Sequence, residues 1–163
     1  MYKIESLTEN HEVESFESGT ESKNNFLKKF ALQNSKGGLG RTFVAVKPPD
    51  AYRVYGYYTI SSSTVKFENL PSKKLPRYPI PSVLIGKLAV DKSAQCQGLG
   101  TALLFDALRR VAKVADEVGI FLVEVKAIDE NAKAFYKKCE FIEMVDAPLN
   151  LYLNLKKIRK LLA

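Results

Sequence analysis

The stretch Leu88-Ala89-Val90-Asp91-Lys92-Ser93-Ala94-Gln95-Cys96-Gln97-Gly98-Leu99-Gly100-Thr101 has the pattern of a strand, a short polar turn with two glycines, and the start of a helix. A helix that begins at such a turn presents unpaired backbone N–H groups and the positive end of its dipole, which suit a phosphate or pyrophosphate. Small residues let an anion approach the backbone closely. An ordinary strand-to-helix connection with a turn glycine also fits these residues. The stretch alone therefore leaves two interpretations open.

Alternating strands and helices surround this stretch, according to the hydrophobic periodicity and the turn signals. The pattern predicts strands at 2–7, 41–47, 52–65, 83–90, 120–128, 141–145 and 149–155, and helices at 21–35, at 98–117 and from an Asp129 N-cap to 138. An antiparallel β-meander is thus followed by β-α-β-α-β-β. This order predicts an α/β (α+β) domain with a mixed central sheet and helices on both faces.

Residues 68–82 contain several prolines, which exclude a helix or a central strand and predict an ordered surface segment. Lys73, Lys74, Arg77 and Tyr78 place three cations and an aromatic ring in this segment. Such a composition favours a binding wall over a simple linker.

The length of 163 residues predicts one domain, 1–163, with a basic C-terminal tail at 156–163. Two cysteines, Cys96 and Cys139, are too few for a disulfide framework, and no Cys/His cluster has zinc spacing, so we expect reduced thiols and no metal. No apolar run is long enough to span a bilayer, and the N-terminus lacks the apolar region of a signal peptide. We expect a cytoplasmic protein without a membrane partner.

The formal net charge of +7 favours a negatively charged partner such as a nucleotide or a nucleic acid. Excess lysine that merely keeps the protein in solution explains the same number. The charge therefore supports an anionic partner without deciding for it.

Two motifs together resemble a known family. Gln95-x-x-Gly98-x-Gly100, placed after the Leu88-Ala89-Val90 strand and at the start of a helix, is similar to the acetyl-CoA-binding signature of the GNAT N-acetyltransferases. Downstream, Asn131-Ala132-Lys133-Ala134-Phe135-Tyr136 resembles the second CoA-contacting helix of that family. The resemblance implies the GNAT fold, in which a mixed, mostly antiparallel central sheet is splayed in the middle.

A closer resemblance covers nearly the whole chain, to the acetyltransferase toxins of type II toxin–antitoxin modules. It is carried by Phe135-Tyr136 and by the segments Asn25-Phe26-Leu27 with Ala31-Leu32-Gln33-Asn34, Thr42-Phe43-Val44-Ala45-Val46, Gly56-Tyr57-Tyr58-Thr59-Ile60-Ser61 and Arg77-Tyr78-Pro79-Ile80-Pro81. It implies an enzyme that acetylates the α-amine of aminoacyl-tRNA and so blocks translation. It also implies a ribbon–helix–helix antitoxin as partner and a homodimer.

The resemblance implies a set of residues that bind acetyl-CoA. Backbone groups of Leu88, Ala89 and Val90 would pair with the pantetheine amides, and the Val90 N–H would polarise the thioester carbonyl. The turn Gln95, Cys96, Gln97, Gly98, Leu99, Gly100 and Thr101 would hold the pyrophosphate on its N–H groups. Asn131, Phe135 and Lys138 share one helical face that could line the CoA arm. A core position for Phe135 is the alternative.

Tyr136 is the predicted catalytic residue. Attack of an amine on the thioester expels a thiolate, and a phenol within hydrogen-bond reach can protonate it as a general acid. A structural tyrosine on an amphipathic helix is the alternative. The attacking amine must be neutral: a lysine with a pKa near 10.4 is only about 0.1% neutral at pH 7.4, whereas an α-amine near 7.8 is roughly 30% neutral. Because only His11 and Glu124 suggest themselves as bases, the low-pKa α-amine of an aminoacyl ester fits best.

Cations are predicted to contact the phosphates of the tRNA acceptor arm, although some of them belong to the solvated surface. They are Lys28, Lys29, Lys36, Arg41, Lys73, Lys74 and Arg77. Two departures from the family pattern stand out: Cys96 where glycine is common, and Cys139-Glu140-Phe141 in place of a Gly-Phe helix ending. The segment Lys157-Ile158-Arg159-Lys160 fits a tRNA contact, an antitoxin contact or a loose tail.

The alternatives to a tRNA-acetylating toxin are an N-acetyltransferase of a protein or small-molecule amine, and a module without turnover. Such a module would bind CoA or nucleic acid within a repressor complex. The intact Gln95-x-x-Gly98-x-Gly100 motif together with Tyr136 speaks against a protein without activity.

Overall fold

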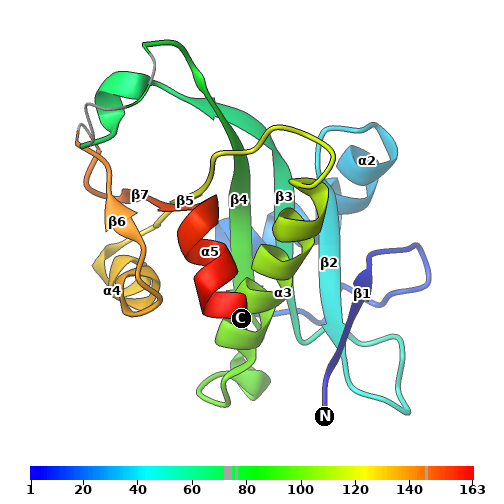
Figure 1. Cartoon of the computed structure of the whole chain (residues 1–163). Coiled ribbons are helices and arrows are strands. Elements are labelled where there is room, and N and C mark those ends of the chain that lie inside the picture. The colour runs from blue at the N-terminus through cyan, green and yellow to red at the C-terminus, as the bar shows by residue number, and fades with distance from the viewer. Residues whose placement is uncertain (72–74, 76, 146) are drawn as a thin grey trace. The chain divides into compact units, whose positions relative to one another are not determined.

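The computed structural model describes residues 1–71, 75, 77–145 and 147–163 (Figure 1). The strands are β1 (Lys3–Ser6), β2 (Arg41–Val46), β3 (Gly56–Val65), β4 (Ile80–Val90), β5 (Leu122–Lys126), β6 (Ile142–Glu143) and β7 (Asn150–Asn154). The helices are α1 (Glu21–Asn25), α2 (Ala31–Lys36), α3 (Leu99–Val114), α4 (Glu130–Lys138) and α5 (Leu155–Leu162). Short helical turns are the π-helical η1 (Phe26–Phe30) and the 3-10 turns η2 (Phe67–Asn69) and η3 (Lys92–Ala94).

The strands are hydrogen-bonded in the order β1-β2-β3-β4-β5-β7-β6. The pairs β1–β2, β2–β3, β5–β7 and β6–β7 are antiparallel, and β4–β5 is parallel. The predicted mixed, mostly antiparallel sheet with helices is therefore confirmed. The chain divides into two compact units, one of 1–61 with 86–107 and the other of 62–85 with 108–163.

In the first unit, the neighbouring residues Tyr57 and Tyr58 show how helices cover both faces of the strands, because successive side chains of a strand point to opposite sides. The Tyr57 hydroxyl donates to the Lys23 carbonyl of α1 at 2.8 Å, and its ring stacks on Phe26. The Tyr58 hydroxyl donates to Asp106 of α3 at 2.6 Å. The α1–η1–α2 segment and α3 thus lie on opposite faces of β3.

The second unit contains the parallel part of the sheet. Ser82–Ile85 of β4 pair with Leu122–Val125 of β5, while β4 itself continues to Val90. Its core consists of apolar side chains from β3, β4, β5, β7 and the connecting segments. These are Val65, Leu70, Ile80, Leu122, Met144 and Tyr152.

The proline-rich segment differs from expectation at its end. Pro81 lies in β4, although the prolines predicted that no central strand would include residues up to 82. Proline lacks an N–H donor but keeps its carbonyl, and a position near the start of a strand tolerates that loss. The Pro81 carbonyl accepts the Phe121 N–H at 2.8 Å. Lys73 and Lys74 lie outside the described residues.

The helix predicted at 21–35 is interrupted by the π-helical turn η1, where the Ala31 N–H donates to the Phe26 carbonyl. A π-helical turn inserts one extra residue and rotates the side chains that follow it. Leu27 and Ala31 are therefore buried, whereas Phe30 is 51% exposed. The expected helix is thus present with one interruption, which its hydrophobic spacing did not predict.

The basic residues from Lys156 onward form the helix α5. The Asn154 side chain caps it by accepting the Lys157 N–H at 2.9 Å, and Ile158 is fully buried. A side-chain cap and an apolar residue buried against the core both stabilise a short helix. The interpretation of these residues as a loose tail was wrong.

Candidate functional site

The carboxyl end of β4 is fixed by the buried side chain of Asp91. Its Oδ1 accepts the Glu17 N–H at 2.8 Å, and its Oδ2 accepts the N–H and the hydroxyl of Ser93 at 3.0 and 2.6 Å. Burial raises the pKa of the Asp91 carboxyl, but these hydrogen bonds and the charge of Arg53 lower it more, so that the net pKa lies below the ordinary value. Asp91 is therefore ionised at neutral pH and holds the start of the turn.

Replacing Asp91 with asparagine should lower the free energy of unfolding by about 2–3 kcal/mol at pH 7, because one amide oxygen cannot accept all three hydrogen bonds. The folded pKa is lowered, so the carboxylate's contribution is present above the ordinary pKa of 3.8 and is lost as the pH falls through the folded pKa. Urea unfolding at pH 7 and near pH 2.5 measures both effects.

The matched control is Ser93→Ala, which removes only one of those hydrogen bonds and should cost about 1 kcal/mol. A gap between wild type and Asp91→Asn that is the same at both pH values would contradict the role of the carboxylate.

Side chains also hold the backbone of the turn and of β4. The Gln95 side-chain amide donates to the carbonyls of Val90 and Ser18, both at 2.9 Å. The Lys23 ammonium donates to the Leu88 carbonyl at 3.1 Å. Each carbonyl keeps a second lone pair. The Gln95 side chain thus stabilises the turn by hydrogen bonds to backbone carbonyls. The contact of Lys23 with β4 was not predicted from the sequence.

The turn itself uses left-handed backbone at Cys96 and Gly98, with φ of 61° and 82°. Glycine adopts this conformation freely, whereas a side chain there costs roughly 1–2 kcal/mol. A Cβ built on Gly98 would meet nothing within 4 Å. The backbone at Gly98 is therefore open to a ligand, directly before the 16-residue helix α3 and its first free N–H groups.

The other residues predicted for this part of the site take different positions. Ala89 and Leu99 are buried, so only their backbones are available to a ligand. Gln97 accepts the Tyr2 hydroxyl at 3.3 Å and is exposed. Gly100 and Thr101 lie in the first turn of α3. The predicted strand–turn–helix is confirmed for the whole stretch from Leu88 to Thr101.

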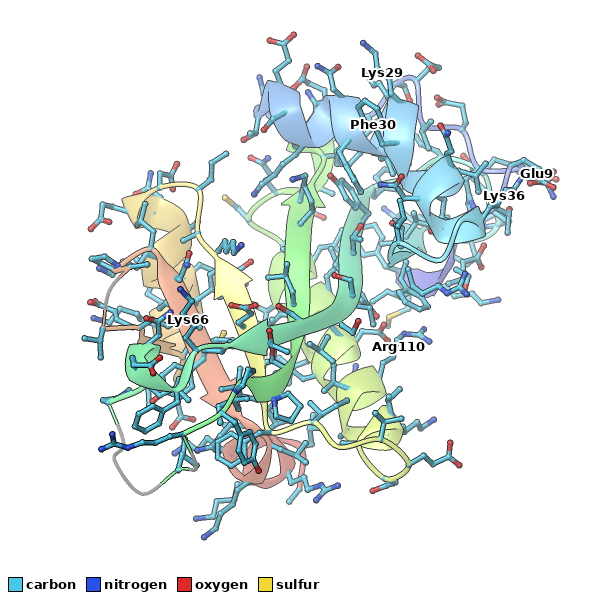
Figure 2. The ribbon with its side chains drawn as sticks, turned by 90° about the horizontal axis from the view of Figure 1, so that it is seen from above. Glu9, Lys29, Phe30, Lys36, Lys66 and Arg110 are labelled. Atoms are coloured by element: carbon cyan, nitrogen blue, oxygen red, sulfur yellow. The ribbon has the colours of Figure 1, made fainter. Side chains whose placement is uncertain are left out.

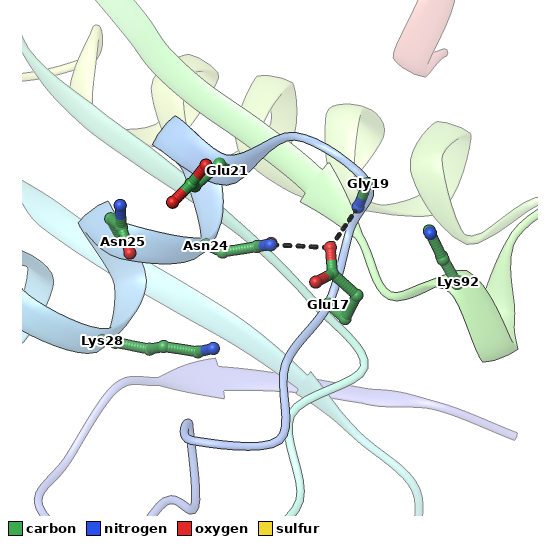
Figure 3. A pocket seen from close by; sticks show the side chains of 7 residues that line it. All are labelled: Glu17, Gly19, Glu21, Asn24, Asn25, Lys28 and Lys92. Carbon is green, nitrogen blue, oxygen red and sulfur yellow. Dashed lines mark hydrogen bonds between the residues drawn. The ribbon is translucent and has the colours of Figure 1, made fainter.

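A polar cavity of about 360 Å³ lies beside α1 (Figure 3). Its lining consists of Glu17, Gly19, Glu21, Asn24, Asn25, Lys28 and Lys92. The Glu17 carboxylate accepts the Asn24 side-chain amide at 2.7 Å and the Gly19 N–H at 2.8 Å. Of the predicted tRNA-binding cations, Lys28 lies here; Lys92, the second cation of the lining, was not predicted as a contact.

In the second unit, Tyr136 lies on α4, and hydrogen bonds fix both ends of this helix. The helix begins at the predicted N-cap, where Asp129 accepts the Ala132 N–H at 2.9 Å. It ends with Glu140 in left-handed backbone at φ 71°, where the N–H groups of Glu140 and Phe141 donate to the Lys137 and Tyr136 carbonyls. This is a Schellman ending with glutamate in the usual glycine position.

The ring of Tyr136 is buried and packs between two phenylalanines. Its centroid lies 5.2 Å from that of Phe135 and 5.6 Å from that of Phe141. Burial, with a smaller contribution from Cys139, raises the pKa of the Tyr136 phenol to about 12. The phenol is therefore protonated at neutral pH, as a general acid must be. Phe135 is half-buried, and Asn131 and Lys138 are exposed on α4.

The two residues considered as bases both have structural partners. His11 is buried in the first unit, where its Nε2 lies 2.8 Å from Glu5 and its Nδ1 accepts the Thr8 N–H. Glu124 is buried in β5 and accepts the Ser63 hydroxyl at 2.6 Å. Both ring nitrogens of His11 are thus occupied by contacts with nearby residues of the same unit.

The predicted cations are spread over several local environments. Lys29 is exposed beside the exposed ring of Phe30, and Lys36 pairs with Glu9 at 3.1 Å (Figure 2). Arg41 donates to the Ser35 carbonyl at 2.7 Å. In the second unit, Arg77 lies over the Phe67 ring at 5.6 Å.

Among residues 1–71, 75, 77–145 and 147–163, no group of His, Cys, Asp and Glu side chains has a geometry that could hold a metal ion. Within the same residues, no helix has the length and apolar character needed to cross a bilayer.

Residues 40–143 match the acetyltransferase (GNAT) domain. A tRNA-acetylating toxin of Mycobacterium tuberculosis is 35% identical over 96% of this chain and 93% of its own length.

Two solved structures have the same fold over nearly their whole length. AtaT complexed with acetyl-methionyl-tRNAfMet is 32% identical, with a TM-score of 0.93 over 100% of both chains. A tyrosine-to-phenylalanine mutant of the AtaT toxin, bound to the C-terminus of the antitoxin AtaR and acetyl-CoA, is 30% identical, with a TM-score of 0.87 over 99% of this chain and 98% of the other.

Proposed function

Because this chain belongs to the GNAT acetyltransferase family, we propose that it is a toxin that transfers the acetyl group of acetyl-CoA to the α-amine of aminoacyl-tRNA and so blocks translation. The substrate is supported by the tRNA-acetylating relative and by AtaT with its acetylated tRNA. The GNAT match covers residues of both units, which supports one acetyltransferase domain in 1–163.

The observation that carries the proposal is the turn between β4 and α3. The N–H groups of Gln97, Gly98, Gly100 and Thr101 would bind the pyrophosphate of acetyl-CoA, because open space at Gly98 lets an anion reach the backbone. The backbone of Leu88, Ala89 and Val90 would pair with the pantetheine arm, and Asn131, Phe135 and Lys138 of α4 would add contacts to it. Acetyl-CoA brings the activated thioester.

Tyr136 is proposed to donate its phenolic proton to the thiolate sulfur as the carbon–sulfur bond breaks. The amine nitrogen forms the new bond to the acetyl carbon and loses one proton to solvent, and the Tyr136 phenolate takes one proton back from solvent. An α-amine with a pKa near 7.8 is already about 30% neutral at pH 7.4, so it needs little help from a base. This preference favours aminoacyl-tRNA over a lysine side chain.

Further parts of the proposal concern partners and location. Lys28, Lys29, Lys36, Arg41, Lys73, Lys74 and Arg77 would contact the tRNA phosphates. We propose an antitoxin partner, which the complex of AtaT with the antitoxin AtaR supports. We propose further that this antitoxin is of the ribbon–helix–helix class and that the toxin is a homodimer. A cytoplasmic location follows from a charged-tRNA substrate.

The experiment is a transfer assay with labelled acetyl-CoA. Charged tRNA, uncharged tRNA and a panel of lysine-containing peptides are incubated separately with the protein. Label should appear only on charged tRNA and leave it as the N-acetyl amino acid after alkaline hydrolysis of the ester. Label on uncharged tRNA or on peptides alone would overturn the proposed substrate, and acetyl-CoA binding without transfer would overturn the enzyme.

A further inference from the structure

A second cavity, of about 420 Å³, lies at the start of α5 in the second unit. Its lining consists of Ile120, Phe121, Asn154, Leu155, Lys156 and Arg159, and it is called the α5 cavity here. The Phe121 N–H donates to the Pro81 carbonyl, and the Leu155 N–H donates to the Phe121 carbonyl, both at 2.8 Å. These backbone hydrogen bonds tie Phe121 to β4 and to the start of α5, and so fix the floor of the cavity.

The lining of the α5 cavity is apolar where it meets solvent. Phe121 is 38% exposed and Leu155 is half-buried, so their side chains form an accessible aromatic and aliphatic surface. Val118, shortly before in the chain, is 59% exposed. A concave apolar surface of this kind gains free energy when an apolar side chain fills it.

The rim of the α5 cavity is cationic. Two of the basic side chains of α5 have local partners, Lys157 with Glu140 at 2.9 Å and Arg159 with Asp116 at 3.1 Å. Lys156 lines the cavity, and Lys160 lies one helical turn further along α5; both are exposed, and neither pairs with a carboxylate among the residues that the structure describes. Over the described part of the chain, the apolar hollow therefore has one free cation, Lys156, in its lining and a second, Lys160, one turn away on α5.

We propose that the α5 cavity docks an acidic amphipathic segment of a partner protein, with an apolar side chain between Phe121 and Leu155 and carboxylates on Lys156 and Lys160. The chemistry of the cavity favours this occupant. RNA phosphates would satisfy the lysines but leave the apolar lining without a matching group. A second copy of this chain would bring two basic α5 helices together, and like charges repel.

The test uses the full-length protein and a helical peptide with leucines at i, i+3 and i+4 among glutamates. Binding is followed by NMR through the Leu155 methyl and Phe121 ring signals, and affinity by fluorescence titration. We expect these signals to shift first, and Lys156→Glu to weaken binding about tenfold. Lys66→Glu, an exposed lysine of the same unit, should change affinity less than about twofold.

Three results would overturn the proposal. The first is equal binding of a peptide with serine in place of leucine, which would reduce the contact to charge alone. The second is a tRNA that shifts the Phe121 and Leu155 signals while the peptide does not. The third is a dimer of the free protein that Lys156→Glu dissociates, which would assign the surface to a second copy. Acetyl transfer is measured separately, and the proposal does not depend on it.

Discussion

Replacing Tyr136 with phenylalanine should lower the rate of acetyl transfer by about two to four orders of magnitude, because the thiolate then leaves without a proton donor. Acetyl-CoA affinity should stay within about twofold of wild type, since the change removes a hydroxyl and keeps the ring. The ring contacts with Phe135 and Phe141 remain, so the fold should be unchanged. Single-turnover transfer and equilibrium binding separate the two effects.

The matched control for this experiment is Tyr152→Phe. Tyr152 is a buried tyrosine of the same unit, in β7, and the variant should transfer acetyl groups at the wild-type rate. Because the Tyr136 pKa is about 12, its phenol stays protonated and the wild-type rate should not fall as the pH rises from 7 to 10. An unchanged rate in Tyr136→Phe, or an equal loss in Tyr152→Phe, would remove Tyr136 from the mechanism.

Local sequence signals predicted those parts of the site that depend on neighbouring residues. The Asp129 cap and the strand, turn and helix from Leu88 to Thr101 were correctly predicted, because capping chemistry and glycine preference act over a few residues. Cys96 was recognised as a departure, and its left-handed backbone explains why glycine is the more common residue there. Such features are determined by residues that are close to one another in the sequence.

Other features depend on contacts between distant segments. The hydrogen bond from Lys23 to the Leu88 carbonyl joins residues far apart in the chain, and no local sequence pattern predicts it. Tertiary packing favours the π-helical turn η1, since the same residues fit an unbroken helix equally well by their spacing. Helix α5 is different, because its signal was present in Asn154 and Ile158 but the basic composition obscured it. A helix this short needs tertiary burial to persist.

Gly98→Ala should raise the KM for acetyl-CoA by about tenfold to a hundredfold, since small displacements of a binding backbone have large effects on binding and rate. In the free protein the new Cβ meets nothing within 4 Å, so it would project into the space that the pyrophosphate is proposed to occupy. The φ of 82° also favours relaxation of the backbone once a side chain is present, which turns the N–H groups away. Initial rates against acetyl-CoA concentration give KM and kcat separately.

Cys96→Gly in the same turn is the control with the opposite expectation. It relieves left-handed strain at φ 61°, against the entropy that glycine adds to the unfolded chain, so its stability should change by less than about 1 kcal/mol. Its KM should stay within about threefold of wild type, because no atom is added to the anion's space. If Cys96→Gly raised KM and Gly98→Ala did not, the pyrophosphate would approach the turn from the Cys96 side. The opposite result fixes Gly98 as the point where the backbone meets the anion.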